Sequence, residues 1–164
     1  MSSTKVIKTA NAPDPVGPYN QAIKAGNFIY CSGQIAIDPV SNKINCLGNI
    51  EKETTQVLKN LLAVLNAGGA KAEDVIKTTI YLTDLKNFKT VNDIYSEFFN
   101  VENPPARACM RHLLEQTTDN HSRLEGGLQG GARPNRKVEH TKVAMCAHCA
   151  TARCYVAHAA DVNT

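Results

Sequence analysis

The chain has 164 residues and a formal net charge of +3, with 18 Lys and Arg against 15 Asp and Glu. A chain of this length can form one domain with a buried core. The net charge is small and spread along the chain, so neither a nucleic acid nor an anionic membrane is expected as a partner. No apolar run approaches the roughly 20 residues that span a bilayer, and no membrane-spanning helix is expected.

The N-terminus and the cysteines bear on the compartment. No apolar stretch follows Met1, so a secretory signal is not expected. Six cysteines would form a disulfide framework only in an exported chain, and free thiols in a reducing compartment are the simpler interpretation. We therefore predict a cytoplasmic protein, with a mitochondrial or nuclear pool left open.

The first predicted element is a β-hairpin over residues 19–32. Two short runs of β-formers flank the pair Gly26-Asn27, which tolerates positive φ. Gly33 follows at once, where the missing Cβ lets another group approach the backbone. Residues 39–48 are polar and rich in turn formers, and they predict a loop.

Next come a helix and a strand. Asn49 is suited to cap the helix, and the pair Gly68-Gly69 supplies its end. Residues 75–83 are rich in β-branched side chains, which predicts a strand covered on at least one face. The apolar face of the helix has helical spacing and consists of Ile50, Val57, Leu58, Leu61, Leu62 and Leu65.

A second helix is predicted to open at Asp84 and Asn87 and to end at the Asn-Pro-Pro run over 103–105. Residues 106–109 indicate the start of a further strand. The order strand, strand, helix, strand, helix predicts an α+β fold, a sheet with two helices packed on one face. The apolar stripe of the second helix consists of Phe88, Val91, Tyr95, Phe98 and Phe99.

The sequence changes character at Met110, since all five histidines follow this residue and all four phenylalanines precede it. Residues 111–141 have few apolar groups to offset chain entropy, so we expect them to be poorly ordered. Residues 143–160 are richer in Ala and Cys and allow a helix, without a clean amphipathic period. We predict an incomplete domain over 1–110 and a divergent, poorly ordered Cys/His-containing tail over 111–164.

The tail contains one set of metal-ligand residue types with the short spacings of a small zinc site. Its first step is Cys-x2-Cys, but the rest departs from the zinc-knuckle order Cys, Cys, His, Cys. Few bulky residues stand nearby to pack around an ion. We predict no metal and keep this set as a weak zinc candidate: Cys146, Cys149, Cys154 and His158.

Motifs before Met110 resemble those of the RidA (YjgF-type) family, the reactive-imine deaminases. They stand in the family's order and spacing over about residues 5–110. The motifs are Asn11-Ala12-Pro13, Gly17-Pro18-Tyr19-Asn20-Gln21-Ala22, Ser32-Gly33-Gln34, Lys77-Thr78-Thr79-Ile80-Tyr81-Leu82, Val91-Asn92 and Pro105-Ala106-Arg107-Ala108-Cys109.

The resemblance implies a chorismate-mutase-like fold, assembled as a homotrimer with active sites in clefts between subunits. Family members hydrolyse 2-iminobutanoate or 2-iminopropanoate, and the enamine tautomers, to a 2-oxo acid and ammonia, without a cofactor or metal. We therefore predict an enzyme, an imine/enamine deaminase of the hydrolase class that needs no cofactor. Its expected partners are the small-molecule substrate and further copies of the chain.

The resemblance also assigns site residues. Arg107 would bind the substrate carboxylate, because its planar fork of donors suits a bidentate anion in a way that lysine does not. Cys109 would lie on the same strand face, in the pocket. Backbone donors near Gly33 would help to orient the substrate or water. Catalytic roles are implied for Arg107, Tyr19 and Ser32, and substrate-binding roles for Arg107, Gly33, Asn92 and Cys109.

The resemblance ends after Cys109. Family members continue into a Val-Glu-Val strand and end on a strand whose glutamate is thought to position or activate water. Residues 110–120 match neither strand, and neither Glu115 nor Glu125 has the expected context. We therefore expect an unrelated tail to replace the last two strands. Two alternatives stay open: an inactive or regulatory isoform, and a ribonuclease or translation inhibitor as described for some animal relatives.

Overall fold

The computed structural model describes residues 4–111 and 143–150. The strands are β1 (Thr4–Ile7), β2 (Ala22–Ala25), β3 (Phe28–Cys31), β4 (Gln34–Ile35), β5 (Val75–Leu82), β6 (Ala106–Arg111) and β7 (Val143–Ala150). The α-helices are α1 (Ile50–Ala67) and α2 (Phe88–Phe98), and short 3-10 turns span Ala72–Asp74 and Leu85–Asn87.

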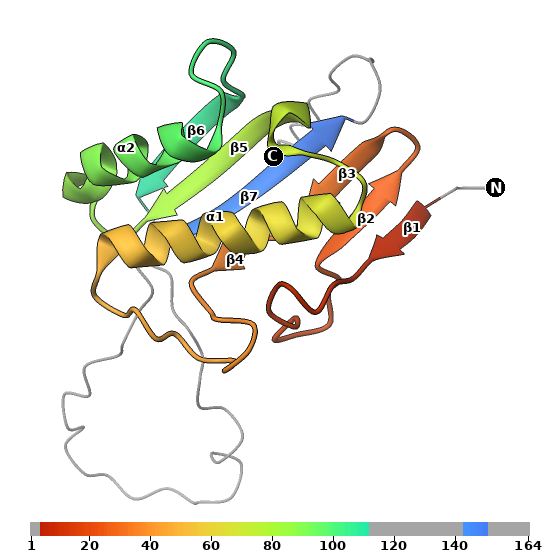
Figure 1. Ribbon diagram of the computed structural model, residues 1–164, viewed down its shortest axis with the longest axis horizontal. Helices are drawn as coiled ribbons and strands as arrows, with labels where there is room; N and C mark the ends of the chain where they lie inside the picture. Colours follow the sequence, from red (N-terminus) through yellow and green to blue (C-terminus); the bar gives the residue numbers. More distant parts are fainter. Residues whose placement is uncertain (1–3, 112–142, 151–164) are drawn as a thin grey trace, which may run out of the picture.

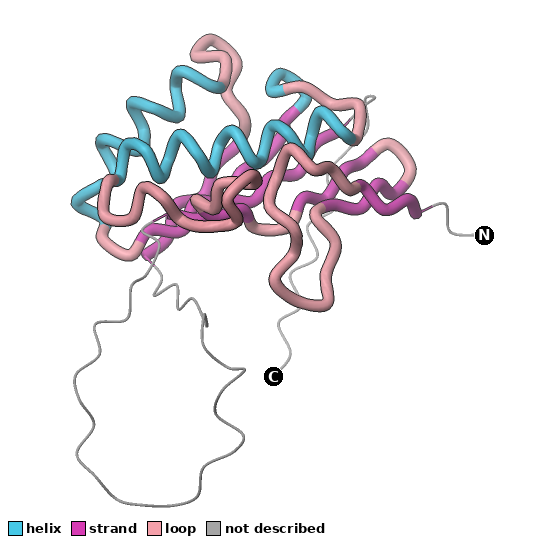
Figure 2. The backbone as a smooth tube through the Cα atoms, turned by 60° about the horizontal axis from the view of Figure 1, so that its bottom comes forward, coloured by secondary structure: helices cyan, strands magenta, loops and turns pink. Residues whose placement is uncertain are grey.

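These strands form one seven-stranded sheet in the order β1-β2-β3-β7-β5-β6, with β4 paired to β7. Both helices lie on the same face of the sheet, α1 across its middle and α2 beside β6 (Figure 1). Figure 2 shows the same separation into a helix layer and a strand layer. The predicted α+β class, with two helices on one face, is confirmed.

The predicted hairpin is confirmed as β2 and β3. The two strands pair antiparallel, and Ala25 stands opposite Phe28 across the turn. Gly26 has a φ of +58° at this turn, a conformation that side chains with a Cβ rarely adopt. The loop over 39–48 is also confirmed and is fastened by an isolated bridge between Asp38 and Lys43.

Helix α1 begins and ends where the sequence predicts. The side chain of Asn49 accepts a hydrogen bond from the backbone N–H of Lys52 at 3.0 Å, and Gly69 follows the helix with a φ of +82°. The apolar face of α1 contacts β3, β4 and β7. Its fully buried members are Val57, Leu58, Leu61, Val64 and Leu65.

The centre of the sheet differs from the sequence-based expectation. β6 runs to Arg111, and β7 pairs antiparallel with β3, β4 and β5 from within the tail. Val143 and Met145 of β7 are fully buried. The predicted loss of the last two strands is therefore corrected, and Val143–Ala150 is a strand where the sequence also allowed a helix.

The physical reason is that a strand buried inside a sheet reads as a continuous run of small and apolar residues, without the alternation that reveals an exposed strand. Pairing with three other strands then decides its conformation, which propensity alone does not. The poor order predicted over 111–141 falls almost entirely outside the described residues, as do residues 151–160 of the expected helix. The division of the chain at residue 110 stays a prediction.

The sheet face opposite the helices has no cover among the described residues. Side chains alternate along a strand, so the neighbours of the buried Ile7, Ile29 and Ile80 point to this face. Strand register places them in rows, with Val6 opposite Ile23, Ile23 opposite Tyr30 and Tyr81 opposite Met110. Val6, Tyr30 and Met110 are 54%, 48% and 46% exposed.

Candidate functional site

Arg107 lies on the edge strand β6, opposite Thr78 of β5 in the parallel register. Its guanidinium carbon Cζ is 4.9 Å from the ring centroid of Tyr95 and 5.5 Å from that of Phe88, both on α2. These are cation–π distances, which favour a guanidinium lying against the rings. Arg107 has no ion pair or hydrogen bond to another described residue, so its N–H donors are available to a ligand.

The ring of Tyr95 is itself firmly held. Its hydroxyl lies 2.8 Å from the Thr78 hydroxyl, and its centroid is 4.4 Å from the ring of Phe99. Tyr95 is 5% exposed and Thr78 is fully buried. The Arg107 guanidinium therefore lies against a ring of α2 that is tied to the sheet through Thr78.

A pocket of about 250 Å³ opens beside Arg107. Asn92 and Ser96 lie one turn apart on the same face of α2 and contribute amide and hydroxyl groups to its wall. The structure therefore brings together two of the predicted site residues, Arg107 and Asn92. The remaining lining residues are Tyr95, Phe99, Asn100, Val101, Pro104 and Pro105.

Cys109 lies two residues beyond Arg107 and packs partly against the core, on the helix-covered side of the sheet. It shares the strand face of Arg107, as predicted, but does not line the pocket. Burial raises the pKa of the Cys109 thiol, and the charge of Arg107 opposes this shift. The thiol is therefore protonated at neutral pH and is poorly suited to act as a nucleophile.

A second group of predicted residues lies near the start of the chain. Tyr19 is 46% exposed, and its hydroxyl accepts a hydrogen bond from the backbone N–H of Val16 at 3.3 Å. Ser32 donates from its hydroxyl to the backbone oxygen of Asn20 at 2.6 Å. Gly33 shares the lining of a small pocket with Tyr19. These contacts place Tyr19, Ser32 and Gly33 near one another.

Gln21 fastens the loop that precedes this group, and its role is not evident from the sequence. Its side chain is 2% exposed. The amide oxygen accepts from the backbone N–H of Thr9 at 2.7 Å. The amide nitrogen donates to the backbone oxygens of Thr9, Ala12 and Pro13 at 2.8 to 3.1 Å. Because an unpaired buried amide would cost free energy, these hydrogen bonds hold the loop in one conformation.

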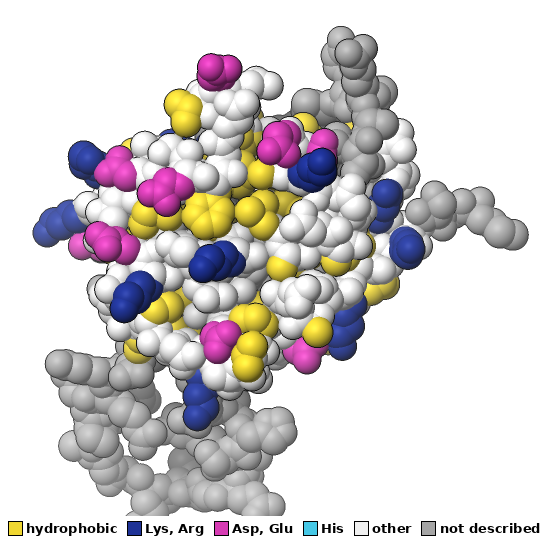
Figure 3. All heavy atoms as spheres, viewed as in Figure 1, with side chains coloured by type: hydrophobic (Ala, Val, Ile, Leu, Met, Phe, Trp, Pro, Cys, Tyr) yellow, Lys and Arg dark blue, Asp and Glu magenta, His cyan; other side chains and the backbone are white. Residues whose placement is uncertain are grey.

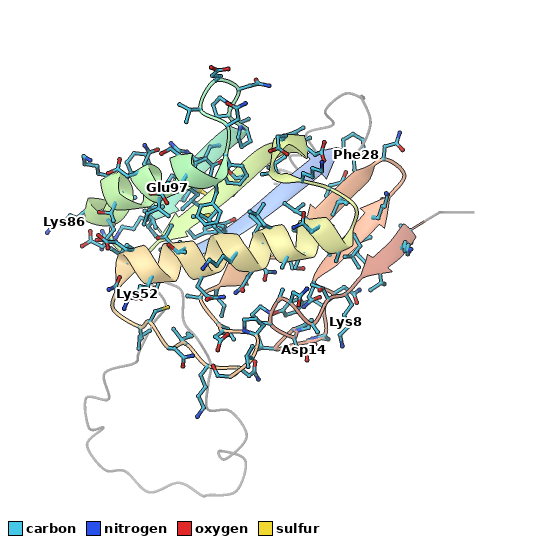
Figure 4. All side chains as sticks on the ribbon, in the orientation of Figure 1. Lys8, Asp14, Phe28, Lys52, Lys86 and Glu97 are labelled. Carbon is cyan, nitrogen blue, oxygen red and sulfur yellow. The ribbon has the colours of Figure 1, made fainter. Side chains whose placement is uncertain are left out.

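The two groups lie apart within one chain. β3 and β6 are separated by β7 and β5, which amounts to three strand spacings or roughly 14 Å. In Figure 4 the loop of the second group is marked by Asp14, and helix α2, which borders Arg107, is marked by Glu97 at the far side of the sheet. Arg107 and Asn92 therefore do not share a site with Tyr19 and Ser32 inside one copy of the chain.

Phe88, Tyr95 and Thr78 are parts of the site that the sequence does not assign. Phe88 and Tyr95 belong to the predicted apolar stripe of the second helix, seven residues apart and so on one face. Phe88 is 40% exposed, because its ring borders Arg107 instead of the core. An aromatic pair at this spacing beside a predicted carboxylate-binding arginine is the signal that would have found them.

Only part of the weak zinc candidate lies within the described residues. Among residues 4–111 and 143–150 there is no group of three or more His, Cys, Asp and Glu that could hold a metal ion. Cys146 and Cys149 fall within β7, while Cys154 and His158 lie outside the described residues.

Neither described helix is long and apolar enough to cross a membrane. Acidic and basic side chains are interspersed on the helix-covered face (Figure 3).

Ionisation of Tyr95 provides a prediction. Burial raises the pKa of its hydroxyl, while the Thr78 hydrogen bond and the charge of Arg107 oppose the shift. A tyrosine in the unfolded chain ionises at about pH 10. Burial favours the protonated hydroxyl in the folded state, so its contribution to the free energy of unfolding is complete below that pH. The contribution is lost as the pH rises through the higher pKa of the folded state. Phenolate absorbance during an alkaline titration should show a late step that is missing in Tyr95→Phe; an unchanged titration would contradict the prediction.

Residues 9–114 match the family model described as Endoribonuclease L-PSP. A RutC family protein of Synechocystis is 50% identical over 106 residues, which are 65% of this chain and 82% of the relative. The human 2-iminobutanoate/2-iminopropanoate deaminase is 45% identical over 105 residues, 64% of this chain and 75% of the relative. The family-model match includes β6 and the predicted site residues before it.

Solved structures agree with this likeness. A Rid family protein of unknown function from Yersinia pestis is 34% identical, with a TM-score of 0.70 over 90% of this chain and 99% of the relative. Escherichia coli TdcF with bound serine is 28% identical, with a TM-score of 0.68 over 89% and 98% of the two chains. The family model covers more than half of the sequence, and the chain belongs to the endoribonuclease L-PSP family, the YjgF/RidA proteins.

Proposed function

We propose that the chain is an imine/enamine deaminase, which hydrolyses 2-imino acids such as 2-iminobutanoate and 2-iminopropanoate to 2-oxo acids and ammonia. The observation that carries the proposal is the guanidinium of Arg107, held 4.9 Å from the Tyr95 ring at the wall of a pocket. Similarity to the human 2-iminobutanoate/2-iminopropanoate deaminase at 45% identity supports the substrate class.

The chemistry follows from binding and orientation. Arg107 would bind the substrate carboxylate through two parallel N–H donors, which fixes the plane of the adjacent imine. Water adds to the imine carbon and gives a carbinolamine, which expels ammonia and leaves the 2-oxo acid. Asn92, at the same pocket, has an amide suited to orient the substrate or the water. No cofactor or metal takes part in these steps.

We further propose that the active sites form between copies of the chain in a homotrimer. Tyr19, Ser32 and Gly33 are too far from Arg107 to act with it in one copy, so a neighbouring copy would supply them. The uncovered sheet face supports association, because it exposes Val6 and Tyr30. A cyclic arrangement would give each copy the same two contacts. The free thiols of Cys31, Cys46 and Cys109 suit the cytoplasm, where we place the protein.

One observation favours the alternative of an inactive or regulatory chain. β7 reads Val-Ala-Met-Cys-Ala-His-Cys-Ala and has no Asp or Glu. The glutamate that family resemblance predicts on the last strand therefore has no counterpart on β7. Loss of a positioned proton-transfer group typically lowers a rate by roughly 10²–10⁴-fold. The chain would then bind 2-imino and 2-oxo acids but convert the former slowly. Ribonuclease activity has no comparable support, since charges are interspersed on the helix-covered surface (Figure 3).

A coupled assay tests the proposal. Purified protein is added to a serine/threonine dehydratase, and release of the 2-oxo acid is followed while sedimentation reports the oligomer. We expect acceleration by a trimer. A well-folded trimer that binds pyruvate without accelerating release would support the alternative, and one that does neither would contradict both. Zinc content of the same sample tests the set of Cys146, Cys149, Cys154 and His158.

A further inference from the structure

A pair of hydroxyl groups lies directly behind the carboxylate-binding arginine. We propose that Thr78 and Tyr95 are positioning residues, whose hydrogen bond fixes the ring against which the Arg107 guanidinium lies and so fixes the direction of its donors. This inference rests on the proposed function for the identity of the ligand, a small 2-oxo or 2-imino carboxylate. Neither Thr78 nor Tyr95 is argued to touch that ligand through its hydroxyl.

Arg107 needs such support because of where it lies. It is exposed on an edge strand, and an arginine side chain has several rotatable bonds and many accessible conformations. Bidentate binding of a carboxylate requires one orientation of the guanidinium plane. No described carboxylate or carbonyl group holds this guanidinium, so the two aromatic rings are its described contacts.

The two rings differ in how well they are held. Phe88 is 40% exposed at the first residue of α2 and lacks a polar group that could be fastened. Tyr95 is 5% exposed, packs against Phe99 at 4.4 Å and bonds to Thr78 at 2.8 Å. Tyr95 is also closer to the guanidinium. The orientation of Arg107 therefore depends mainly on Tyr95.

Strand register makes Thr78 the appropriate anchor. Thr78 stands opposite Arg107 in the β5–β6 pairing, and its side chain is fully buried beneath α2. The same ladder position thus fixes the backbone of Arg107 and, through the hydroxyl pair, the ring that contacts its guanidinium. A shift of α2 along the sheet would break the hydroxyl contact and displace the ring. The hydrogen bond between Thr78 and Tyr95 therefore fixes the position of α2 along the sheet relative to Arg107.

The test measures pyruvate binding by calorimetry in Tyr95→Phe, Thr78→Val and the double variant. Tyr95→Phe keeps the ring and removes only the hydroxyl. One lost hydrogen bond should weaken binding roughly fivefold. The double variant should be no weaker than the single ones, because one bond joins both groups. Thr78→Ser keeps the hydroxyl and should bind pyruvate as the wild type does. The control is Thr55→Val on α1, because the Thr55 hydroxyl donates to the backbone oxygen of Glu51 within its own helix.

Two further readouts separate positioning from general destabilisation. In the deaminase assay KM should rise while kcat changes less than about twofold, because the lost contact acts on carboxylate binding. The Arg107 Nε–Hε signal in nuclear magnetic resonance spectra should broaden or shift in Tyr95→Phe but not in Thr55→Val. Unchanged pyruvate affinity and an unchanged Arg107 signal in folded Tyr95→Phe would overturn the inference. Wild-type protein that does not bind pyruvate would instead overturn Arg107 as the carboxylate anchor, and the Arg107 signal would then decide the positioning role.

Discussion

Arg107→Lys is expected to weaken pyruvate binding and to lower any deaminase kcat/KM by roughly 100-fold, because one hydrogen bond to a charged group contributes about 1.5–3 kcal/mol. Lysine keeps the positive charge but loses the fork of donors that binds both carboxylate oxygens. It also loses the flat surface that lies against the rings of Tyr95 and Phe88. The measurements are calorimetric titration with pyruvate and the coupled dehydratase assay.

The matched control is Arg111→Lys, since Arg111 lies on the same strand, is also exposed and does not line the pocket beside Arg107. The free energy of unfolding of both variants should lie within about 0.5 kcal/mol of the wild-type value, as is usual for substitutions of exposed residues. Equal pyruvate affinity in Arg107→Lys and wild type would show that Arg107 is not the carboxylate anchor.

Met145→Asp is expected to destabilise the fold by more than about 4 kcal/mol, because it places a carboxylate in the interior without a partner. Met145 is fully buried, opposite Ile80 of β5 and Gln34 of β4. Urea denaturation followed by circular dichroism measures the loss. Val40→Asp provides the comparison, since Val40 is 93% exposed and its replacement should change the free energy of unfolding by less than about 0.5 kcal/mol. A Met145→Asp protein as stable as Val40→Asp would show that β7 is not the central strand.

Local signals explain which parts of the fold the sequence predicts. The hairpin has a Gly-Asn turn, and α1 has a cap at Asn49 and a stop at Gly68, each within a few residues of the element it defines. β1 and β4 have four and two residues, too few for a periodic pattern. β7 depends on partners as distant as β3, with Cys149 opposite Ile29, and no local signal encodes such a pairing.

The site follows the same division. The motif around Arg107 predicts a carboxylate-binding residue, and the helix period brings Asn92 to the same pocket. The sequence also assigns Tyr19 and Ser32 to that site, yet the sheet holds them several strands away. A sequence motif does not say whether two residues belong to one copy of the chain or to two, and the proposed trimer would bring these residues together. The sequence does not predict the contact of Phe88 with Arg107, because an aromatic residue in an apolar stripe is expected to be buried in the core.

The central position of β7 has a consequence for synthesis on the ribosome. β3, β4 and β5 emerge early, but the strand that joins them is completed only at Ala150. Until then their facing edges carry unpaired backbone donors and acceptors, which attract other strands. Pairing of β7 with β3 joins residues that are far apart in the sequence, and such long-range pairing is slow. The nascent chain therefore cannot complete its sheet before β7 is free to pair, and pulse-labelled protein should gain protease resistance only after Ala150 has left the exit tunnel.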